Sequence, residues 1–125
     1  MQIRESAENY LETILMLKKK IGKVRSIDIV NELGFSKPSV SVAMKNFKEN
    51  DLITIDEEGY ITLTHSGLKI AQNILERHET LSKMLIMLGV NEETAKEDAC
   101  KMEHVLSEES YNKIKEHIIK TIDKK

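Results

Sequence analysis

Apolar residues recur at helical spacing along most of this chain of 125 residues. Positions i, i+3, i+4 and i+7 share one face of a helix, whereas short β-rich runs around a turn indicate strands. The pattern predicts helices over 5–20 and 26–33, and further helices that begin near residues 37, 65, 92 and 107. Two short runs, 52–55 and 60–64, flank a turn at Gly59 and predict a hairpin. The expected fold class is therefore mainly α.

Capping residues place the helix boundaries. Ser26 is expected to cap the helix over 26–33, and Ser36 the next helix, where Pro38 falls in the first turn. Asn91 is expected to cap the helix that follows Gly89. Three residues of the helix over 26–33 are expected to face inward: Ile27, Val30 and Leu33. In the last helix, a dimer seam or simple packing on the two preceding helices would explain the stripe of Tyr111, Ile114, Ile118 and Ile122.

The segment 26–48 has the pattern of a helix-turn-helix. A short helix, a turn around Gly34 and a second helix with small polar and basic outer residues follow one another. Hydroxyl groups at the front of such a helix can approach base edges, lysines reach phosphates, and Val42 suits a thymine methyl group. An ordinary helical hairpin has the same pattern. The residues expected to meet DNA are Arg25, Ser36, Lys37, Pro38, Ser39, Ser41, Val42, Lys45 and Lys48.

A hairpin directly after a helix-turn-helix is typical of a winged helix. The tip of this hairpin carries three consecutive acidic residues, Asp56, Glu57 and Glu58. Carboxylates repel DNA phosphates, so the tip is not expected to grip the DNA backbone. The hairpin is expected to act as a structural cap.

Composition and charge agree with a helix-rich globular protein. Charged residues make up 32% of the chain, aromatic residues 4%, and tryptophan is absent. The formal net charge is −2, yet eight basic residues lie between Lys18 and Lys48 against only two acidic ones. A local basic patch of this kind is typical of a domain that binds DNA and recognises its sequence. No apolar run has the length of a membrane span, and a single cysteine suits a reducing cytosol, so a cytoplasmic protein without membrane contact is expected.

Candidate metal chemistry gathers at 100–104. Cys100, Glu103 and His104 stand at i, i+3 and i+4, which on a helix places three side chains on one face. A thiolate, a carboxylate and an imidazole together suit a divalent transition metal better than calcium or magnesium. The alternative is a solvated Glu-His pair beside a small buried cysteine. His78 lies on an otherwise apolar helical stripe, where a histidine that only packs is the ordinary interpretation.

Taken together, these segments resemble the metal-dependent repressors of the diphtheria toxin repressor and manganese transport regulator type. The similarity covers nearly the whole chain, and its most specific part is the run Glu-His-Val-Leu-Ser with an upstream cysteine. It implies a winged helix-turn-helix DNA-binding domain over 1–65 and a helical metal-binding and dimerisation domain over 66–125. The matching segments are 10–14, 36–44, Leu63-Thr64-x-x-Gly67, Arg77-His78 and 99–107.

The resemblance also implies a ligand set and a metal. By position the metal ligands would be Asn9, Glu12, His78, Cys100, Glu103 and His104. Manganese-type members carry acids where this chain has Asn9 and Cys100, whereas iron-type members share the cysteine but have methionine in place of Asn9. Fe²⁺ or Mn²⁺ is the expected metal, and Co²⁺, Ni²⁺ or Zn²⁺ would also suit the thiolate. The ancillary site of iron-type members is not expected, because Ser82 and Lys96 stand where that site has a carboxylate and a histidine.

The implied function is a homodimer that binds a palindromic DNA operator when loaded with metal and represses metal-homeostasis genes. No organic ligand and no enzymatic activity are expected, and the residues themselves leave activation open. Two other interpretations remain. One is a winged-helix regulator that does not need metal, and the other is a small metal-dependent hydrolase, for which no second catalytic group is evident.

Overall fold

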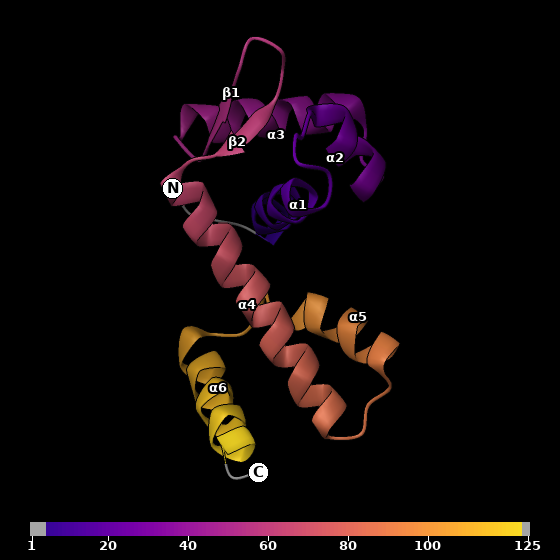
Figure 1. The fold of residues 1–125 in the computed structure, drawn as a ribbon, viewed down its shortest axis with the longest axis vertical. Coiled ribbons are helices and arrows are strands. Elements are labelled where there is room, and N and C mark those ends of the chain that lie inside the picture. The colour runs from indigo at the N-terminus through magenta and orange to yellow at the C-terminus, as the bar shows by residue number, and fades with distance from the viewer. Residues whose placement is uncertain (1–4, 124–125) are drawn as a thin grey trace. The chain divides into compact units, whose positions relative to one another are not determined.

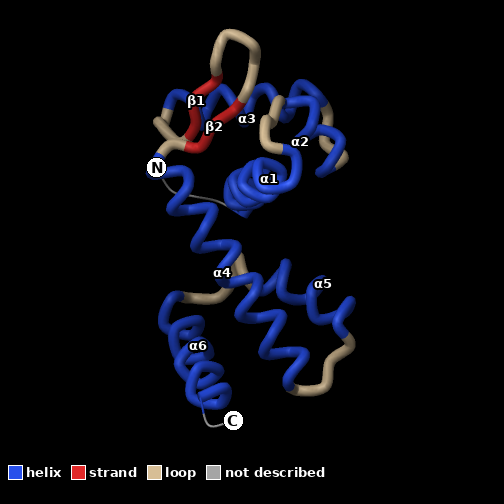
Figure 2. Tube along the Cα trace, viewed as in Figure 1, coloured by secondary structure: helices blue, strands red, loops and turns tan. Residues whose placement is uncertain are grey.

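The computed structural model describes residues 5–123, and Figures 1 and 2 show that helices make up most of this part of the chain. The chain forms two compact units, one up to Asn73 and one from Ile74 onward. The predicted fold class, mainly α with a winged helix-turn-helix ahead of a helical unit, is confirmed. In chain order the elements are α1 (Glu5–Ile21), α2 (Ser26–Leu33), α3 (Lys37–Glu49), β1 (Ile53–Ile55), β2 (Ile61–Leu63), α4 (His65–Met87), α5 (Glu92–Met102) and α6 (Glu108–Asp123).

In the first unit, α2 and α3 form the predicted helix-turn-helix. Gly34 ends α2 in the left-handed conformation, with φ 71°, which glycine adopts without a steric penalty. Ser36 then caps α3, because its hydroxyl oxygen accepts a hydrogen bond from the Ser39 backbone N–H at 3.2 Å. The inner face of α3 is buried at Val40, Met44 and Phe47, as the apolar stripe predicts.

The start of α2 differs from the prediction in its register. Arg25, not Ser26, occupies the cap position, and its backbone N–H donates to the Asp28 carboxylate at 2.9 Å. The inward face of α2 also differs from the prediction. Ile29 is fully buried, whereas Ile27 remains 42% exposed.

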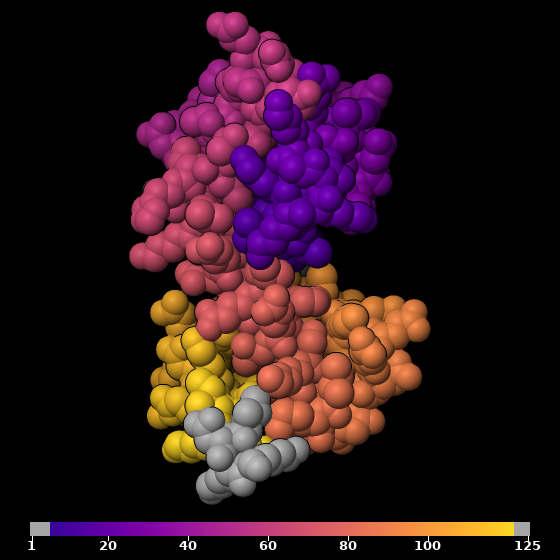
Figure 3. All heavy atoms as spheres, in the orientation of Figure 1, coloured from indigo at the N-terminus to yellow at the C-terminus, as the bar shows by residue number. Residues whose placement is uncertain are grey.

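The wing is an antiparallel hairpin in which Ile53 pairs with Leu63 and Ile55 with Ile61. Val24, in the segment that joins α1 to α2, forms a further antiparallel bridge with Ile61. The loop between the strands projects from the surface of the first unit in the ribbon and space-filling views (Figures 1 and 3). Its three acidic residues are exposed, and the Asp56 carboxylate accepts the backbone N–H groups of Glu58 and Tyr60, both at 2.9 Å.

The helix α4 begins against the wing. The Thr64 hydroxyl donates to the Asp51 carbonyl at 2.6 Å and accepts from the Gly67 N–H at 3.2 Å. Gly67 itself is buried, and a β-carbon there would lie 2.0 Å from the Leu52 carbonyl oxygen. These contacts anchor the first turn of α4 within the first unit.

The second unit consists of the remainder of α4 with α5 and α6. Asn91 caps α5 as predicted, because its side chain accepts the Glu93 N–H at 2.9 Å. On α6, Tyr111 and Ile118 are buried, so these two residues of the predicted stripe pack inside the unit; the side chain of Ile122 lies outside the described part. The Tyr111 hydroxyl donates to Thr80 Oγ1 on α4 at 3.3 Å. Among the helices of 5–123, none combines the length and apolar character that crossing a bilayer would require.

Candidate metal centre and nucleic-acid interface

The α5 helix ends sooner than the spacing of 100–104 predicts. Its last residue is Met102, Glu103 is the C-cap with φ −59° and ψ −26°, and a turn follows. Cys100 therefore stands on the helix while Glu103 and His104 stand in the turn. Cys100 is exposed and Glu103 is fully buried, and the shared face of the three side chains stays a prediction.

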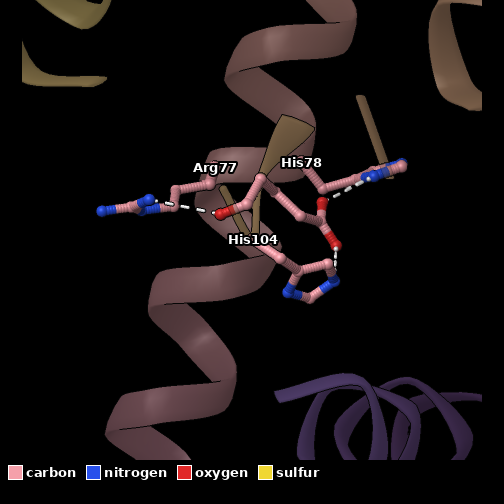
Figure 4. A network of polar contacts seen from close by, with 4 residues as sticks. Arg77, His78 and His104 are labelled. Atoms are coloured by element: carbon pink, nitrogen blue, oxygen red, sulfur yellow. Dashed lines mark hydrogen bonds and ion pairs between the residues drawn. The ribbon is translucent and has the colours of Figure 1, made fainter. Parts of the chain in front are cut away.

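Glu103 lies between two histidines within the second unit (Figure 4). Its Oε2 atom is 3.0 Å from His78 Nδ1, on α4, and its Oε1 atom is 3.2 Å from His104 Nε2. The carboxylate is completely buried and the His104 side chain is 1% exposed, whereas His78 retains 26% exposure. A buried carboxylate is costly unless it is paired. The hydrogen bond with His78 stabilises it here, and His104 Nε2 lies within ion-pair distance of its other oxygen.

Arg77 holds the same turn through its backbone. The Arg77 guanidinium donates to the carbonyl oxygens of Glu103, at 3.2 Å, and Leu106, at 2.9 Å (Figure 4 shows the first of these bonds). It also lies over the Tyr111 ring at 4.8 Å from the ring centre. Sequence reasoning placed Arg77 next to His78 but assigned it no role. In the sequence, Arg77 is marked only by its position directly before the candidate ligand His78.

The six predicted ligands are divided between the two units. Asn9 and Glu12 lie on α1 in the first unit, where Asn9 is half-buried and the Glu12 side chain is buried at 8% exposure. The other four lie in the second unit, where Glu103 contacts both His78 and His104. Within 5–123, no three His, Cys, Asp or Glu side chains converge as ligands of one ion would. Chemically, however, the carboxylate, imidazole and thiol donors all suit a divalent transition metal.

A hollow of about 440 Å³ adjoins His78 in the second unit. Ser82 and Lys96, which occupy the positions of the ancillary site in iron-type proteins, both line it. Lys96 is paired with Glu92 at 3.1 Å, and the Ser82 hydroxyl is buried. The positive charge of Lys96 beside this hollow disfavours the binding of a second metal ion there.

The predicted DNA-contacting residues are all exposed on the first unit. Val42 is the largest apolar member, with 61% exposure, on the face of α3 opposite its buried stripe. Ser36 and Ser39 are linked at the start of α3, since the Ser36 hydroxyl donates to Ser39 Oγ at 2.8 Å. The exposed residues are Arg25, Ser36, Lys37, Pro38, Ser39, Ser41, Val42, Lys45 and Lys48.

Comparison with known families assigns both parts of the chain to one family. Residues 2–66 match the family described as iron dependent repressor, N-terminal DNA binding domain. Residues 64–120 match the metal binding and dimerisation domain of the same repressors. The chain belongs to the iron-dependent repressor family. Iron-dependent repressors are metal-dependent transcriptional regulators.

Individual iron-dependent repressor relatives support this assignment. The chain is 37% identical over 107 residues to the transcriptional regulator MntR of Escherichia coli O6:H1, covering 86% of this chain and 69% of that protein. It is 33% identical over 122 residues to an uncharacterised helix-turn-helix regulator of Methanocaldococcus jannaschii, covering 96% of this chain and 98% of that protein.

Solved structures of the same family have the same fold. The structure of IdeR from T. acidophilum superposes with a TM-score of 0.79 at 27% identity, covering 94% of this chain and 55% of that one. The structure of a manganese-dependent transcriptional repressor in complex with manganese superposes with a TM-score of 0.77 at 27% identity. The match covers 86% of this chain and 50% of that one. This chain thus spans about half the length of those two proteins.

Proposed function

We propose that this protein is a metal-responsive transcriptional repressor that binds a palindromic operator as a homodimer. The observation that carries the proposal is the pairing, in one chain, of an exposed helix-turn-helix face with a buried carboxylate held between two histidines. An exposed basic and hydroxyl-bearing helix face suits DNA. A buried Glu-His-His group suits a divalent metal. The relatives are regulators, and this protein is proposed to act by binding alone, without catalysis.

The metal is proposed to bind to Glu103, His78 and His104, with Cys100, Asn9 and Glu12 completing the set. When bound, a divalent cation supplies positive charge and a common point of attachment for carboxylates and imidazoles. Fe²⁺ or Mn²⁺ is the proposed physiological ion, and Co²⁺, Ni²⁺ and Zn²⁺ are expected to bind in vitro because the thiolate favours them. The two direct Glu-His contacts of the second unit would be exchanged for bonds to the ion.

The regulatory step is proposed to be a link between the two units. Asn9 and Glu12 belong to the unit that carries the helix-turn-helix, and the other ligands to the unit that carries α5 and α6. Ligands drawn from both units would restrict the first unit to the arrangements that suit a palindromic operator. Coupling of this kind is typically worth about 1–3 kcal/mol, and it is reciprocal, so operator DNA should tighten metal binding by the same factor.

At the DNA, α3 is proposed to lie in the major groove. Ser39, Ser41 and Val42 would face base edges, while Lys45 and Lys48 would meet phosphates. The remaining exposed residues named above, from Arg25 to Pro38, would position the front of α3 on the backbone. A two-fold symmetric dimer requires two half-sites about one helical turn apart.

Operator binding by fluorescence anisotropy tests the proposal. The full chain would be titrated, under anaerobic and thiol-reduced conditions, into duplex DNA from upstream of its own gene with Fe²⁺, Mn²⁺, Co²⁺ or Zn²⁺ at fixed salt. We expect binding that requires metal and is lost on chelation. Equal binding with and without metal would favour a metal-independent winged-helix regulator, an alternative that the direct contacts of His78 and His104 with Glu103 support.

A Glu103→Gln variant tests the metal site separately from the DNA. Glutamine keeps the size of the side chain but removes its charge, so we expect metal affinity, measured by calorimetry with Mn²⁺ or Co²⁺, to fall by at least tenfold. Operator binding should then lose its metal response. Glu97→Gln, at an exposed position of α5, makes the same change away from the site and should behave as wild type. A Glu103→Gln protein with wild-type metal affinity would contradict the assignment.

A further inference from the structure

Two cations at the base of the wing share one aromatic ring. The Lys23 ammonium lies 4.9 Å, and the Arg25 guanidinium 4.4 Å, from the centre of the Tyr60 ring. Both positive charges are attracted by the negative face of an aromatic ring, which holds flexible side chains in place without neutralising them. Within 5–123, neither cation has a carboxylate partner.

The backbone explains why these three side chains meet. Val24 pairs with Ile61 across an antiparallel bridge, with the Ile61 N–H donating to the Val24 carbonyl at 2.7 Å. Val24 and Ile61 both point into the core, where they are 0% and 1% exposed. Because successive side chains of extended backbone alternate between faces, Lys23, Arg25 and Tyr60 fall together on the outer face.

We propose that Lys23 and Arg25, held on Tyr60, form a binding site for a DNA backbone phosphate beside the helix-turn-helix. Two neighbouring cations repel each other, and a phosphate between them relieves that repulsion while releasing counterions. This inference rests on the proposed function, to which it adds Lys23 as a phosphate contact and Tyr60 as a positioning residue.

The position of the cluster suits a phosphate rather than a base edge. Arg25 is the N-cap of α2, the first helix of the helix-turn-helix. In such motifs the second helix enters the major groove and the first crosses the sugar-phosphate backbone. The wing would therefore contact DNA through its cationic base, while its exposed acidic tip stays away from the phosphates.

The test measures how DNA affinity depends on salt, using the full chain with Mn²⁺ and a mixed-sequence duplex, since phosphate contacts do not depend on sequence. Lys23→Gln and Arg25→Gln should each weaken binding roughly five- to tenfold. Each should also reduce the slope of log affinity against log salt by about one per subunit bound to DNA. Lys120→Gln, the same substitution at an exposed position of α6, should change neither quantity.

Tyr60 is tested by exchange of the ring. Tyr60→Phe retains the aromatic face and should bind like wild type, whereas Tyr60→Leu should weaken binding by a few fold and lower the salt slope. In a protein that already carries Lys23→Gln and Arg25→Gln, Tyr60→Leu should have no further effect on affinity. Melting curves would confirm that each variant is folded. A purely structural role for Tyr60 would weaken binding equally in both backgrounds and would overturn its assignment as a positioning residue.

The outcomes separate this inference from the proposed function. Wild-type salt slopes for both Lys23→Gln and Arg25→Gln, in a protein that still responds to metal on its operator, would overturn the phosphate site alone. Reduced slopes in a protein without any metal response would support the phosphate site and contradict the metal-dependent function. A wild-type chain that binds no duplex DNA would overturn both.

Discussion

Gly67 is the glycine of the first unit at which an added β-carbon would clash with the backbone. A β-carbon at this position would lie 2.0 Å from the Leu52 carbonyl oxygen and 3.3 Å from a Leu63 methyl group. The Leu52 carbonyl also accepts the Thr64 N–H at 3.0 Å, so it cannot retreat without breaking the start of α4. The glycine is needed here for close approach of two backbones, not for an unusual φ angle.

Gly67→Ala is therefore expected to destabilise the protein. Overpacking of a close contact typically costs about 1–3 kcal/mol, and a clash with backbone belongs at the upper end of that range. The melting temperature, followed by circular dichroism, should fall by several degrees. Ser66→Ala, at the exposed neighbouring position, should leave it nearly unchanged. A Gly67→Ala protein as stable as wild type would mean that the wing and α4 can move apart to accommodate the methyl group without loss of stability.

At the scale of elements, Arg77 joins α4 to the turn between α5 and α6. Its two hydrogen bonds go to the backbone carbonyls of Glu103, the C-cap of α5, and of Leu106, beyond the helix, and its stacking on Tyr111 adds a contact to α6. One side chain thus positions the segment that carries Glu103 and His104.

Removal of the guanidinium should loosen that turn. Arg77→Met keeps the aliphatic stem but removes both donors, and hydrogen bonds from a charged donor contribute about 1.5–3 kcal/mol. We expect the free energy of unfolding in urea to fall by about 2 kcal/mol. Lys69→Met, an exposed cation of the same helix, serves as the matched control. Arg77→Lys should recover only part of the loss, because an ammonium group lacks the planar fork.

The ion pair between Lys115 on α6 and Glu76 on α4 gives these helices a pH-dependent contact. The hydrogen bond to the Glu76 carboxylate, and then its negative charge, raise the pKa of Lys115 above its usual 10.5. A raised pKa means that the folded protein holds this proton more tightly. The pair therefore contributes stability fully below pH 10.5, and that contribution is lost as the pH rises through the folded pKa.

A double-mutant cycle can isolate this contact. Lys115→Met and Glu76→Gln should each lower the melting temperature slightly at pH 7, and the double variant should lose less than the sum of the two. Above the folded pKa of Lys115, the interaction free energy between the two positions should vanish. An interaction that persists unchanged at that pH would show that the ammonium charge is not its source.

The elements themselves were largely predictable from local sequence. Ser36 and Asn91 cap their helices through hydrogen bonds between their side chains and backbone N–H groups at most three residues away. Such short-range capping can be recognised from the residue type and its position in the sequence. The N-cap of α2 was not predictable in this way, because Ser26 is the residue type that usually caps a helix. Arg25 occupies the cap position instead, and its backbone N–H donates to the Asp28 carboxylate. The buried residue of α2 is Ile29, whereas the apolar pattern placed Ile27 inward.

The sequence predicts candidate residues for a metal site, but it does not predict where α5 ends among them. Helical spacing brought Cys100, Glu103 and His104 together in the sequence analysis. The helix stops at Met102, and the carbonyl of Glu103 beyond it accepts a hydrogen bond from Arg77, which is 26 residues away in the sequence. Because Arg77 and Glu103 are so far apart in the sequence, the spacing of apolar and polar residues does not indicate this hydrogen bond. The assignment of all six ligands, and the boundary at 65/66, stay predictions.

At the scale of the whole molecule, the family's dimerisation domain implies a second copy of the chain. Three consecutive apolar residues at the end of α4 are exposed: Ile86 at 43%, Met87 at 40% and Leu88 at 74%. Contiguous exposed apolar side chains of this size mark surfaces that bind other proteins. We expect the homodimer to bury this segment.

Ile86→Glu tests the dimer surface. A charge at the centre of a buried interface costs several kcal/mol unless it is paired, so the variant should sediment as a monomer at concentrations where the wild type is a dimer. Affinity for a palindromic operator should fall in parallel, because two half-sites would no longer be bound together. Lys113→Glu, on the exposed side of α6, changes charge in the same direction and should still dimerise. A dimeric Ile86→Glu protein would direct the search to other exposed apolar residues, such as Val105 and Ile119.

The acidic tip of the wing has a consequence for the search along a chromosome. A duplex that first touched the protein at Asp56, Glu57 and Glu58 would be repelled by three carboxylates, whereas one that arrived at the wing's base would be attracted by two cations. Misoriented encounters would therefore be brief, and those in which α3 already faces the groove would last longer. The hairpin would in this way shorten the time spent on unproductive collisions more than it strengthens the final complex.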